Sequence, residues 1–524
     1  MSEFVIELPI HTFKYCHDPN MPKQVIVIQL KAKDMDISSG GSYIATMQEQ
    51  DAALFDLHHG DRVKISRRGR SVIAVLNIAE GRKAVSPGSI GLFEEIIRDL
   101  RVRDGQRVSL SLVKKPDSVY FIKRKMDGFI LSPKEIDAII QDVVENRLSS
   151  IELAYFVAAS YMNVFTFRET VALTRSLISH GKTIHFNRYP VVDKHCTGGV
   201  AGNRTTMVIV PILAAAGLTV PKTSSRSITS PAGTADVMEV LADVSLSIPR
   251  IRQVVRKTNA CMVWGGALGL APADDRIIQV EHPLSIDAKS QLISSILAKK
   301  KSVSATHLLV DIPIGKNAKV VSRKHAYDLK RLFTRICRLL GIKVKVIITD
   351  GSQPIGNGLG PALEARDVLW LLQNDSRAPQ DLKKKSLGMA GMLLEMAGKC
   401  RPGKGRQRAA EMLESGKAYQ KMMEIIRAQG ARIVHADQIP LAPFRWQYRS
   451  PVSGRIRELH NKILSKTARI AGAPQDKGAG IYLEKHVGDA VKKGERIFTL
   501  YSNSRQRLQY AVEFFRKFNQ VAVR

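Results

Sequence analysis

One stretch of the sequence predicts the fold around it: residues 190–220 read PVVDKHCTGGVAGNRTTMVIVPILAAAGLTV. Its first residues are apolar and strand-like, and an apolar, helix-like run follows the polar centre. The adjacent glycines Gly198 and Gly199 allow backbone N–H groups to approach an anion closely, and the start of the following helix adds a favourable dipole. This turn is predicted to bind phosphate, although it matches neither of the two common glycine-rich nucleotide motifs. The alternative is a glycine-rich turn without a ligand. The polar side chains available to a phosphate are Lys194, Thr197, Thr205 and Thr206.

A second polar loop follows at residues 222–236, which read KTSSRSITSPAGTAD. Its hydroxyls and the guanidinium of Arg226 suit phosphate or sugar hydroxyls, whereas the alternative is a solvated Ser/Thr loop. Three further polar or glycine-rich segments lie at residues 281–287, 311–319 and 350–360. All of them follow candidate strands, which is where open α/β sheets build their sites.

The predicted fold class is multidomain α/β, in four parts. Residues 1–115 alternate apolar and polar positions between glycine turns, which predicts a small β-barrel, and the similar segments 57–63 and 102–108 indicate internal pseudo-symmetry. Residues 116–185 are predicted to be helical, because three capping boxes begin at Ser132, Ser149 and Thr166.

Residues 186–524 are predicted to form a sheet domain followed by a smaller module. Residues 186–434 alternate strand-like and helical runs, which is typical of an α/β domain with a mostly parallel sheet. Expected strands are Met207–Ile209, Leu308–Asp311 and Val344–Thr349. Residues 435–524 are predicted to form a C-terminal α+β module that is β-rich and barrel-sandwich-like.

The composition is that of a folded protein, with 44% hydrophobic and 24% charged residues among 524. Lys and Arg number 80 against 48 Asp and Glu, so the formal charge of +32 attracts anions. The basic residues are scattered, which favours a small anion in a cleft over a nucleic acid.

The chain has five cysteines that lie far apart, which argues against a structural zinc site. No signal peptide is visible, and the apolar window Met207–Val220 is too short to cross a bilayer, so a cytoplasmic location is expected.

Several motifs, taken in order, resemble the thymidine phosphorylase family, including its longer AMP phosphorylase members. Residues 194–199 read KHCTGG, which resembles the family's Lys-His-Ser-Thr-Gly-Gly phosphate motif with Cys196 in place of Ser. The resemblance runs from about residue 127 to the C-terminus, and the N-terminal barrel resembles the extra domain of the long type. Further matches are CMV at 261–263, LAPAD at 270–274, SILAKK at 295–300, TDGSQPIG at 349–356 and LE at 363–364.

This resemblance implies a pentosyltransferase that uses inorganic phosphate to cleave the N-glycosidic bond of a thymidine-type nucleoside, giving free base and (deoxy)ribose 1-phosphate. It implies a cleft between the helical and α/β domains, and a homodimer or higher oligomer formed through the helical domain. No cofactor, metal or membrane is implied, since phosphate is a co-substrate. By motif position, the phosphate-binding residues are Lys194, Thr197, Gly198, Gly199, Thr205, Ser224 and Thr234.

Two departures favour an alternative within the same family. The family's pyrimidine pocket has a Tyr and an Arg where this chain has Ile277 and Val280, so a pyrimidine would lose a charged donor. The loop at residues 225–231 resembles the AMP phosphorylase loop Ser-Arg-x-Ile-Thr-Ser-Pro. The alternative is therefore an AMP or nucleoside monophosphate phosphorylase that gives free base and ribose 1,5-bisphosphate. The resemblance then implies substrate-binding residues at Ser225, Arg226, Ser227, Ile228, Thr229, Ser230, Ser295, Lys299 and Lys319.

Phosphorolysis requires phosphate held below C1′ of the sugar and a proton for the departing base nitrogen. Asp287 matches the family's proton donor and is the predicted general acid, a role for which burial must raise its pKa. His195 is the rival acid, or else a structural histidine that orients the loop. Arg226 and Lys319 are predicted to bind the substrate's own phosphate.

Two other functional classes remain as alternatives. An RNA-binding protein would use the +32 charge but leaves both polar loops unexplained. A phosphoribosyltransferase of the anthranilate branch shares a similar architecture, but the sequence shows no acidic cluster for its metal.

Overall fold

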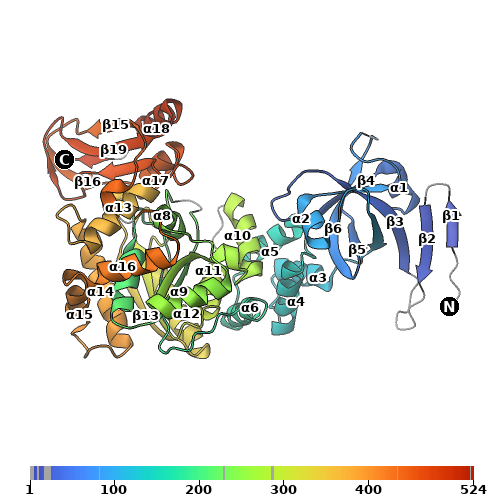
Figure 1. Cartoon of the computed structure of the whole chain (residues 1–524), viewed down its shortest axis with the longest axis horizontal. Coiled ribbons are helices and arrows are strands. Elements are labelled where there is room, and N and C mark those ends of the chain that lie inside the picture. The colour runs from blue at the N-terminus through green and yellow to red at the C-terminus, as the bar shows by residue number, and fades with distance from the viewer. Residues whose placement is uncertain are drawn as a thin grey trace. The chain divides into compact units, whose positions relative to one another are not determined.

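The computed structural model describes residues 5–8, 11–16 and 25–524, with gaps at 82, 228–229, 285–287, 434 and 520. The chain divides into two compact units. The first unit comprises residues 1–176 and 273–291, and the second comprises residues 177–272 and 292–524. Figure 1 shows these elements and labels many of them by their number in chain order.

The first unit contains a closed β-barrel of six strands, because β8 pairs both with β5 and with β3. Alternate residues fill its interior, such as Val63 and Ile65 on β5, which are fully buried. The repeated turn-then-strand pattern is confirmed: Gly60 and Gly105 both have positive φ, and each precedes a strand. Around the barrel the strands are β3 (Val25–Asp34), β7 (Ser89–Leu92), β4 (Ile44–Gln48), β6 (Arg70–Ala79), β5 (Arg62–Arg67) and β8 (Arg107–Leu112).

Further elements adjoin the barrel in sequence. Strands β1 (Val5–Leu8) and β2 (His11–Cys16) extend the sheet antiparallel from β3, and the helices α1 (Glu49–Leu54) and α2 (Glu94–Leu100) precede β5 and β8.

Three predicted capping boxes begin the helices that follow the barrel. Ser132 and Ser149 exchange hydrogen bonds with the glutamates three residues later, and Thr166 does the same with Glu169. These exchanges satisfy N–H groups that a helix start leaves free. The helices of this part are α3 (Asp117–Met126), α4 (Pro133–Val144), α5 (Ser150–Met162), α6 (Phe167–Ser179) and α10 (Pro272–Leu284).

The second unit is built on parallel strands, as predicted. One group has the order β13, β12, β9 and another pairs β10 with β11, and a single bridge between Val191 and Thr219 joins them. All these pairings are parallel, so the carboxyl ends of the strands lie at one edge. The strands are β9 (Val192–Cys196), β10 (Val220–Ser224), β11 (Ala260–Trp264), β12 (His307–Ile314) and β13 (Lys343–Asp350).

The prediction of a strand at Met207–Ile209 is wrong, because these residues belong to helix α7 (Thr205–Ala215). Residues 205–214 are all buried, so the helix is apolar on every side and its sequence lacks the polar stripe that identifies a surface helix. The strand expected in the apolar residues at the start of the 190–220 stretch is β9, and it runs from Val192 through charged residues to Cys196.

Helices and short turns complete the α/β part of the second unit. They are α8 (Thr234–Leu241), α9 (Ile248–Thr258), η1 (Gly265–Leu268), α11 (Lys289–Lys301), α12 (Arg323–Leu339), α13 (Pro361–Leu372), α14 (Gln380–Met396), α15 (Gly405–Glu414), α16 (Lys417–Ala428) and η2 (Ala436–Gln438).

The C-terminal residues form two small sheets and two helices. Strand β14 (Gly358–Leu359), from the α/β part, pairs with β17 (Gly480–Leu483), so the two parts share a sheet. An aromatic cluster of Trp446, Tyr448, Phe498 and Phe515 packs in the core of the module. The other elements are β15 (Phe444–Arg449), β16 (Gly454–Glu458), α17 (Asn461–Ile470), β18 (Ala490–Val491), β19 (Arg496–Ser502), α18 (Arg505–Phe518) and β20 (Ala522–Val523).

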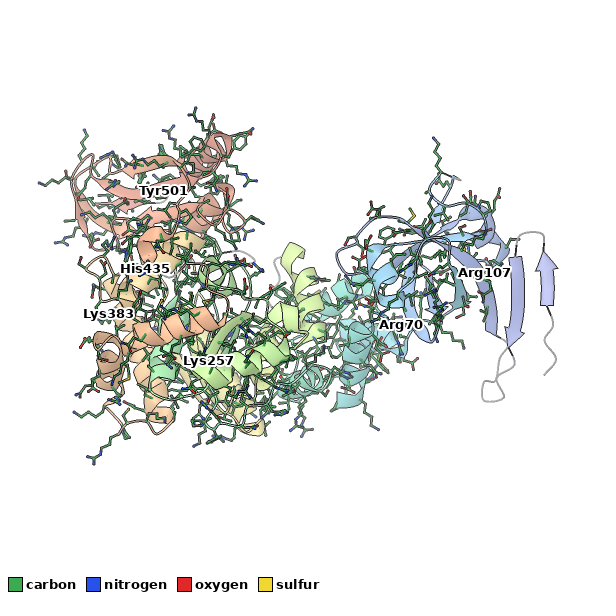
Figure 2. All side chains as sticks on the ribbon, in the orientation of Figure 1. Arg70, Arg107, Lys257, Lys383, His435 and Tyr501 are labelled. Atoms are coloured by element: carbon green, nitrogen blue, oxygen red, sulfur yellow. The ribbon has the colours of Figure 1, made fainter. Side chains whose placement is uncertain are left out.

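The basic side chains are distributed over many elements. Of the residues labelled in Figure 2, Arg70 lies on β6, Arg107 on β8, Lys257 on α9 and Lys383 on α14. In the part of the chain that the structure describes, no helix is both long and apolar enough to cross a membrane.

Candidate functional site

The predicted phosphate loop connects β9 to α7 at the carboxyl edge of the parallel strands. Lys194 is 3% exposed, and its Nζ donates to Thr205 Oγ1 at 2.8 Å. Thr205 Oγ1 donates in turn to Asn203 Oδ1 at 3.1 Å, which holds the lysine against the turn. The buried Thr197 Oγ1 has no hydrogen-bond partner among the described residues. A buried hydroxyl without a partner is unusual, and this one leaves a donor that a ligand acceptor could use.

Gly199 and Gly202 are required by close packing as well as by backbone angle. Gly198, Gly199 and Gly202 have φ of +94°, +86° and +68°. A Cβ on Gly199 would lie 2.2 Å from Lys319 N, and a Cβ on Gly202 would lie 2.3 Å from Ile355 O. The phosphate loop therefore packs directly on the backbone of the segments that follow β12 and β13.

Lys194 shares its face of the sheet with a second charged group. Asp311, which is fully buried, accepts from Thr349 Oγ1 at 2.6 Å, and its Oδ2 lies 3.2 Å from Lys385 Nζ. Burial lowers the pKa of Lys194 because its charged form loses hydration, and Cys196 and Asp311 act in the opposite direction. A bound anion would further stabilise the charged lysine.

The opposite face of β9 carries Asp193 and His195, since neighbouring residues of a strand point to opposite sides. Asp193 is 1% exposed and lies between two lysines, with Lys300 Nζ at 2.7 Å and Lys222 Nζ at 3.7 Å. Burial lowers the pKa of His195 well below its usual value, and the charges of Lys300, Lys222 and Lys194 lower it further. His195 is therefore neutral near pH 7.

The second polar loop is held in place by a buried carboxylate. Asp236 Oδ2 accepts from Ser227 N at 2.7 Å and from Gly233 N at 2.8 Å. Hydroxyls in this region bond to nearby groups: Ser224 to Val263 O, Ser230 to Ala232 O, and Thr234 to the guanidinium of Arg204.

Arg226, predicted to bind a substrate phosphate, forms a bidentate ion pair with Glu239 at 2.7 and 2.5 Å. Its guanidinium also lies 4.8 Å from the ring centroid of Trp264. The hydrogen bonds from Arg226 lower the pKa of Glu239 to about 2. A substrate phosphate would have to compete with this carboxylate for the arginine.

Some of the remaining predicted site residues lie in the part of the chain that the structure describes, and others lie outside it. Ser295 and Lys299 lie one turn apart on α11, and Lys319 follows β12, where its backbone contacts Gly199. Ser225 is exposed. Ile228, Thr229 and Asp287 lie outside the described residues. The structure thus brings five predicted phosphate residues together at one turn: Lys194, Thr197, Gly198, Gly199 and Thr205.

Several charged residues that the structure places around this turn had no role in the sequence-based prediction. Asp193, Lys222 and Lys300 form one buried group, and Asp311 and Lys385 form another. Charged residues inside otherwise apolar strands, such as Asp193 and Asp311, are a usable signal, because buried charges need partners. Nothing in the local sequence indicated Lys385. Within the described ranges, no three His, Cys, Asp or Glu side chains gather so as to hold a metal ion.

Comparison with family models identifies three matching regions. Residues 119–181 match the helical bundle domain of the glycosyl transferase family, and residues 188–419 match its a/b domain. Residues 456–522 match the pyrimidine nucleoside phosphorylase C-terminal domain.

The chain is similar to complete proteins over most of its length. It is 41% identical over 494 residues to AMP phosphorylase of Methanococcus vannielii, covering 94% of this chain and 97% of that protein. AMP phosphorylase of Methanocaldococcus jannaschii is 41% identical over 492 residues, covering 94% and 96%. A Legionella pneumophila protein, provisionally named thymidine phosphorylase, is 43% identical over 455 residues, covering 87% of each chain.

Among solved structures, anthranilate phosphoribosyltransferase (TrpD) from Thermus thermophilus matches with a TM-score of 0.50 and 19% identity. It covers 60% of this chain and 99% of that one, a likeness that shows the fold alone. The identities to complete proteins carry the assignment instead: this chain is an enzyme that belongs to the glycosyltransferase-type family of nucleoside phosphorylases, which includes AMP phosphorylase and thymidine phosphorylase.

Proposed function

We propose that this enzyme cleaves AMP with inorganic phosphate. A phosphate oxygen attacks C1′ of the ribose, the N-glycosidic bond breaks, and its electron pair moves to the base nitrogen, which takes up a proton. The products are adenine and ribose 1,5-bisphosphate. No cofactor enters this balance, because phosphate is itself a substrate.

The observation that carries the proposal is the unpartnered Thr197 hydroxyl in the Lys194–Thr205 turn. Two glycines with positive φ leave the backbone of the turn accessible at the same place. A tetrahedral oxyanion would accept from the hydroxyl and from backbone N–H groups while it pairs with the buried lysine.

Three features favour AMP over a thymidine-type nucleoside. Relatives named AMP phosphorylase are 41% identical over 94% of this chain. The loop at residues 225–231 resembles theirs, and Ile277 and Val280 replace the polar pair of the pyrimidine pocket. The first expectation from the sequence, a thymidine-type substrate, is therefore less well supported than its alternative.

We assign the proton donor to Asp287. His195 is neutral because burial and four lysines lower its pKa, so it lacks the additional proton of an imidazolium acid. We retain Ser225–Ser230 and Lys319 as the region for the 5′-phosphate. Arg226 can contribute only by exchanging Glu239 for that phosphate.

One assay tests the substrate directly. Purified protein with phosphate is given AMP, CMP, UMP, adenosine, uridine and thymidine, and free base and sugar phosphate are measured. Release of adenine and ribose 1,5-bisphosphate from AMP, with much slower release from adenosine, is the expected result. Preferential cleavage of thymidine would reject the proposal in favour of a pyrimidine nucleoside phosphorylase.

We also infer that the chain forms a homodimer through the helices of the first unit. Eight large apolar side chains of these helices and of the segments between them remain more than half exposed, and an interface would cover them. They are Tyr120, Phe129, Ile130, Ile151, Tyr155, Tyr161, Met162 and Val164.

A further inference from the structure

One side chain of the C-terminal module bonds to the backbone of the phosphate loop. Asn461, the first residue of α17, accepts from Ala201 N through Oδ1 at 3.2 Å. Its Nδ2 donates to Gly351 O, also at 3.2 Å. Asn461 is 1% exposed, so water does not replace either bond. A single amide therefore joins the loop after β9 to the loop after β13.

The same two loops are held to each other and to the module by further contacts. Ile355 N donates to Ala201 O at 3.1 Å. The side chain of Ala201 lies in the hydrophobic core of the C-terminal module, together with Leu459 and Leu464. Farther along the second loop, Val487 N donates to Gln353 Oε1 at 2.8 Å. The module thus contacts the loop after β9 through Ala201 and the loop after β13 through Gly351 and Gln353.

We propose that Asn461 is a positioning residue for the phosphate site: it holds residues 198–202 in the conformation that binds orthophosphate. The inference rests on the proposed function of this loop. An amide suits the position because it supplies one acceptor and one donor without charge. A carboxylate would lack the donor and would place negative charge near the phosphate.

Two variants of the full chain test this role. Asn461→Leu keeps the branching and the number of side-chain heavy atoms but leaves Ala201 N–H and Gly351 C=O buried without partners. We expect the Kd for inorganic phosphate, measured by calorimetry, to rise about tenfold or more. The KM for AMP at saturating phosphate should change far less. In Asn461→Asp, the loss of phosphate affinity relative to the wild type should shrink as the pH falls, because protonation removes the charge and restores a donor.

Ser502→Ala is the matched control, since Ser502 is fully buried in the same module and donates to Ala471 O at 2.6 Å. We expect it to lower Tm and leave phosphate affinity unchanged. If Asn461→Leu also lowers only Tm, Asn461 is merely structural and the inference is overturned. A wild-type chain that binds phosphate but releases no base would reject the proposed function, while the calorimetric comparison would still decide the role of Asn461. A wild-type chain that binds no phosphate would overturn both.

Discussion

Among single residues, the two candidate acids have different expected roles in catalysis. Asp287→Asn cannot donate a proton to the departing base, so kcat should fall by at least about a hundredfold. His195→Asn should reduce kcat much less, because His195 is neutral near pH 7. Steady-state rates of adenine release from AMP measure both effects. Turnover at the wild-type rate in Asp287→Asn would remove that residue from the acid role.

A second prediction at this scale concerns the carboxylate between two buried lysines. Asp193→Asn leaves Lys222 and Lys300 without their shared counter-charge, and should lower the free energy of unfolding by about 3–5 kcal/mol. Urea unfolding at pH 7 measures the loss. The control is Glu411→Gln, which breaks the exposed pair with Arg408 and should cost less than about 1 kcal/mol. Equal losses of unfolding free energy in the two variants would show that other groups compensate the charges of Lys222 and Lys300.

Asp367 predicts a pH dependence of stability. Its Oδ2 accepts from Asn357 N and Gly358 N, both at 2.7 Å, and its Oδ1 is buried without a partner. Burial raises the pKa of Asp367 from 3.8 to about 7, against the effect of the two N–H donors. The folded state therefore binds more protons than the unfolded state between these values, so this residue's contribution to stability falls as pH rises through that range.

The variant Asp367→Asn keeps an oxygen for the two N–H donors and does not titrate. Its free energy of unfolding, measured in urea from pH 4 to 8, should therefore decline less with rising pH than that of the wild type. Parallel pH profiles would mean that Asp367 keeps an ordinary pKa in the folded protein.

Among the structural elements, the β9–α7 loop depends on the absence of one side chain. Gly199→Ala would place a Cβ 2.2 Å from Lys319 N, so the loop must move away from the segment after β12. We expect kcat/KM for phosphate to fall by about a hundredfold, the scale on which misplaced groups reduce rates. Gly217→Ala is the control, because Gly217 has φ +78° and meets only the end of Lys399 at 3.7 Å. It should lower stability without changing phosphate kinetics, and a similar kinetic loss in both variants would contradict the packing argument.

For the whole molecule, the exposed apolar side chains of the first unit predict self-association. Met162 is 78% exposed and Ile130 is 64% exposed. The double variant Ile130→Lys, Met162→Lys should shift the chain from dimer to monomer at micromolar concentration, because buried unpaired lysines oppose association. Light scattering coupled to size-exclusion chromatography measures the mass. The exposed substitution Leu339→Lys, on α12, is the control, and an unchanged dimer in the double variant would place the interface elsewhere.

Much of this architecture could be predicted because its signals are local. A capping box needs residues only three apart, so Ser132, Ser149 and Thr166 indicated three helix starts correctly. Adjacent glycines before an apolar helix likewise indicated the turn at Gly198 and Gly199. Local signals gave the wrong element at Met207–Ile209, where every residue is apolar and a buried helix cannot be told from a strand. The C-terminal helices α17 and α18 were not located individually.

By itself, the sequence determined the family, the parallel α/β domain and the glycine turn after β9, because each is marked by short motifs of residues close together in the chain. Only the tertiary structure decided which charges meet. Arg226 pairs with Glu239, Lys385 reaches Asp311, and Asn461 joins Ala201 to Gly351 across 260 and 110 residues. Such contacts depend on how distant elements pack, and a buried polar group takes whichever partner that packing brings within hydrogen-bond distance.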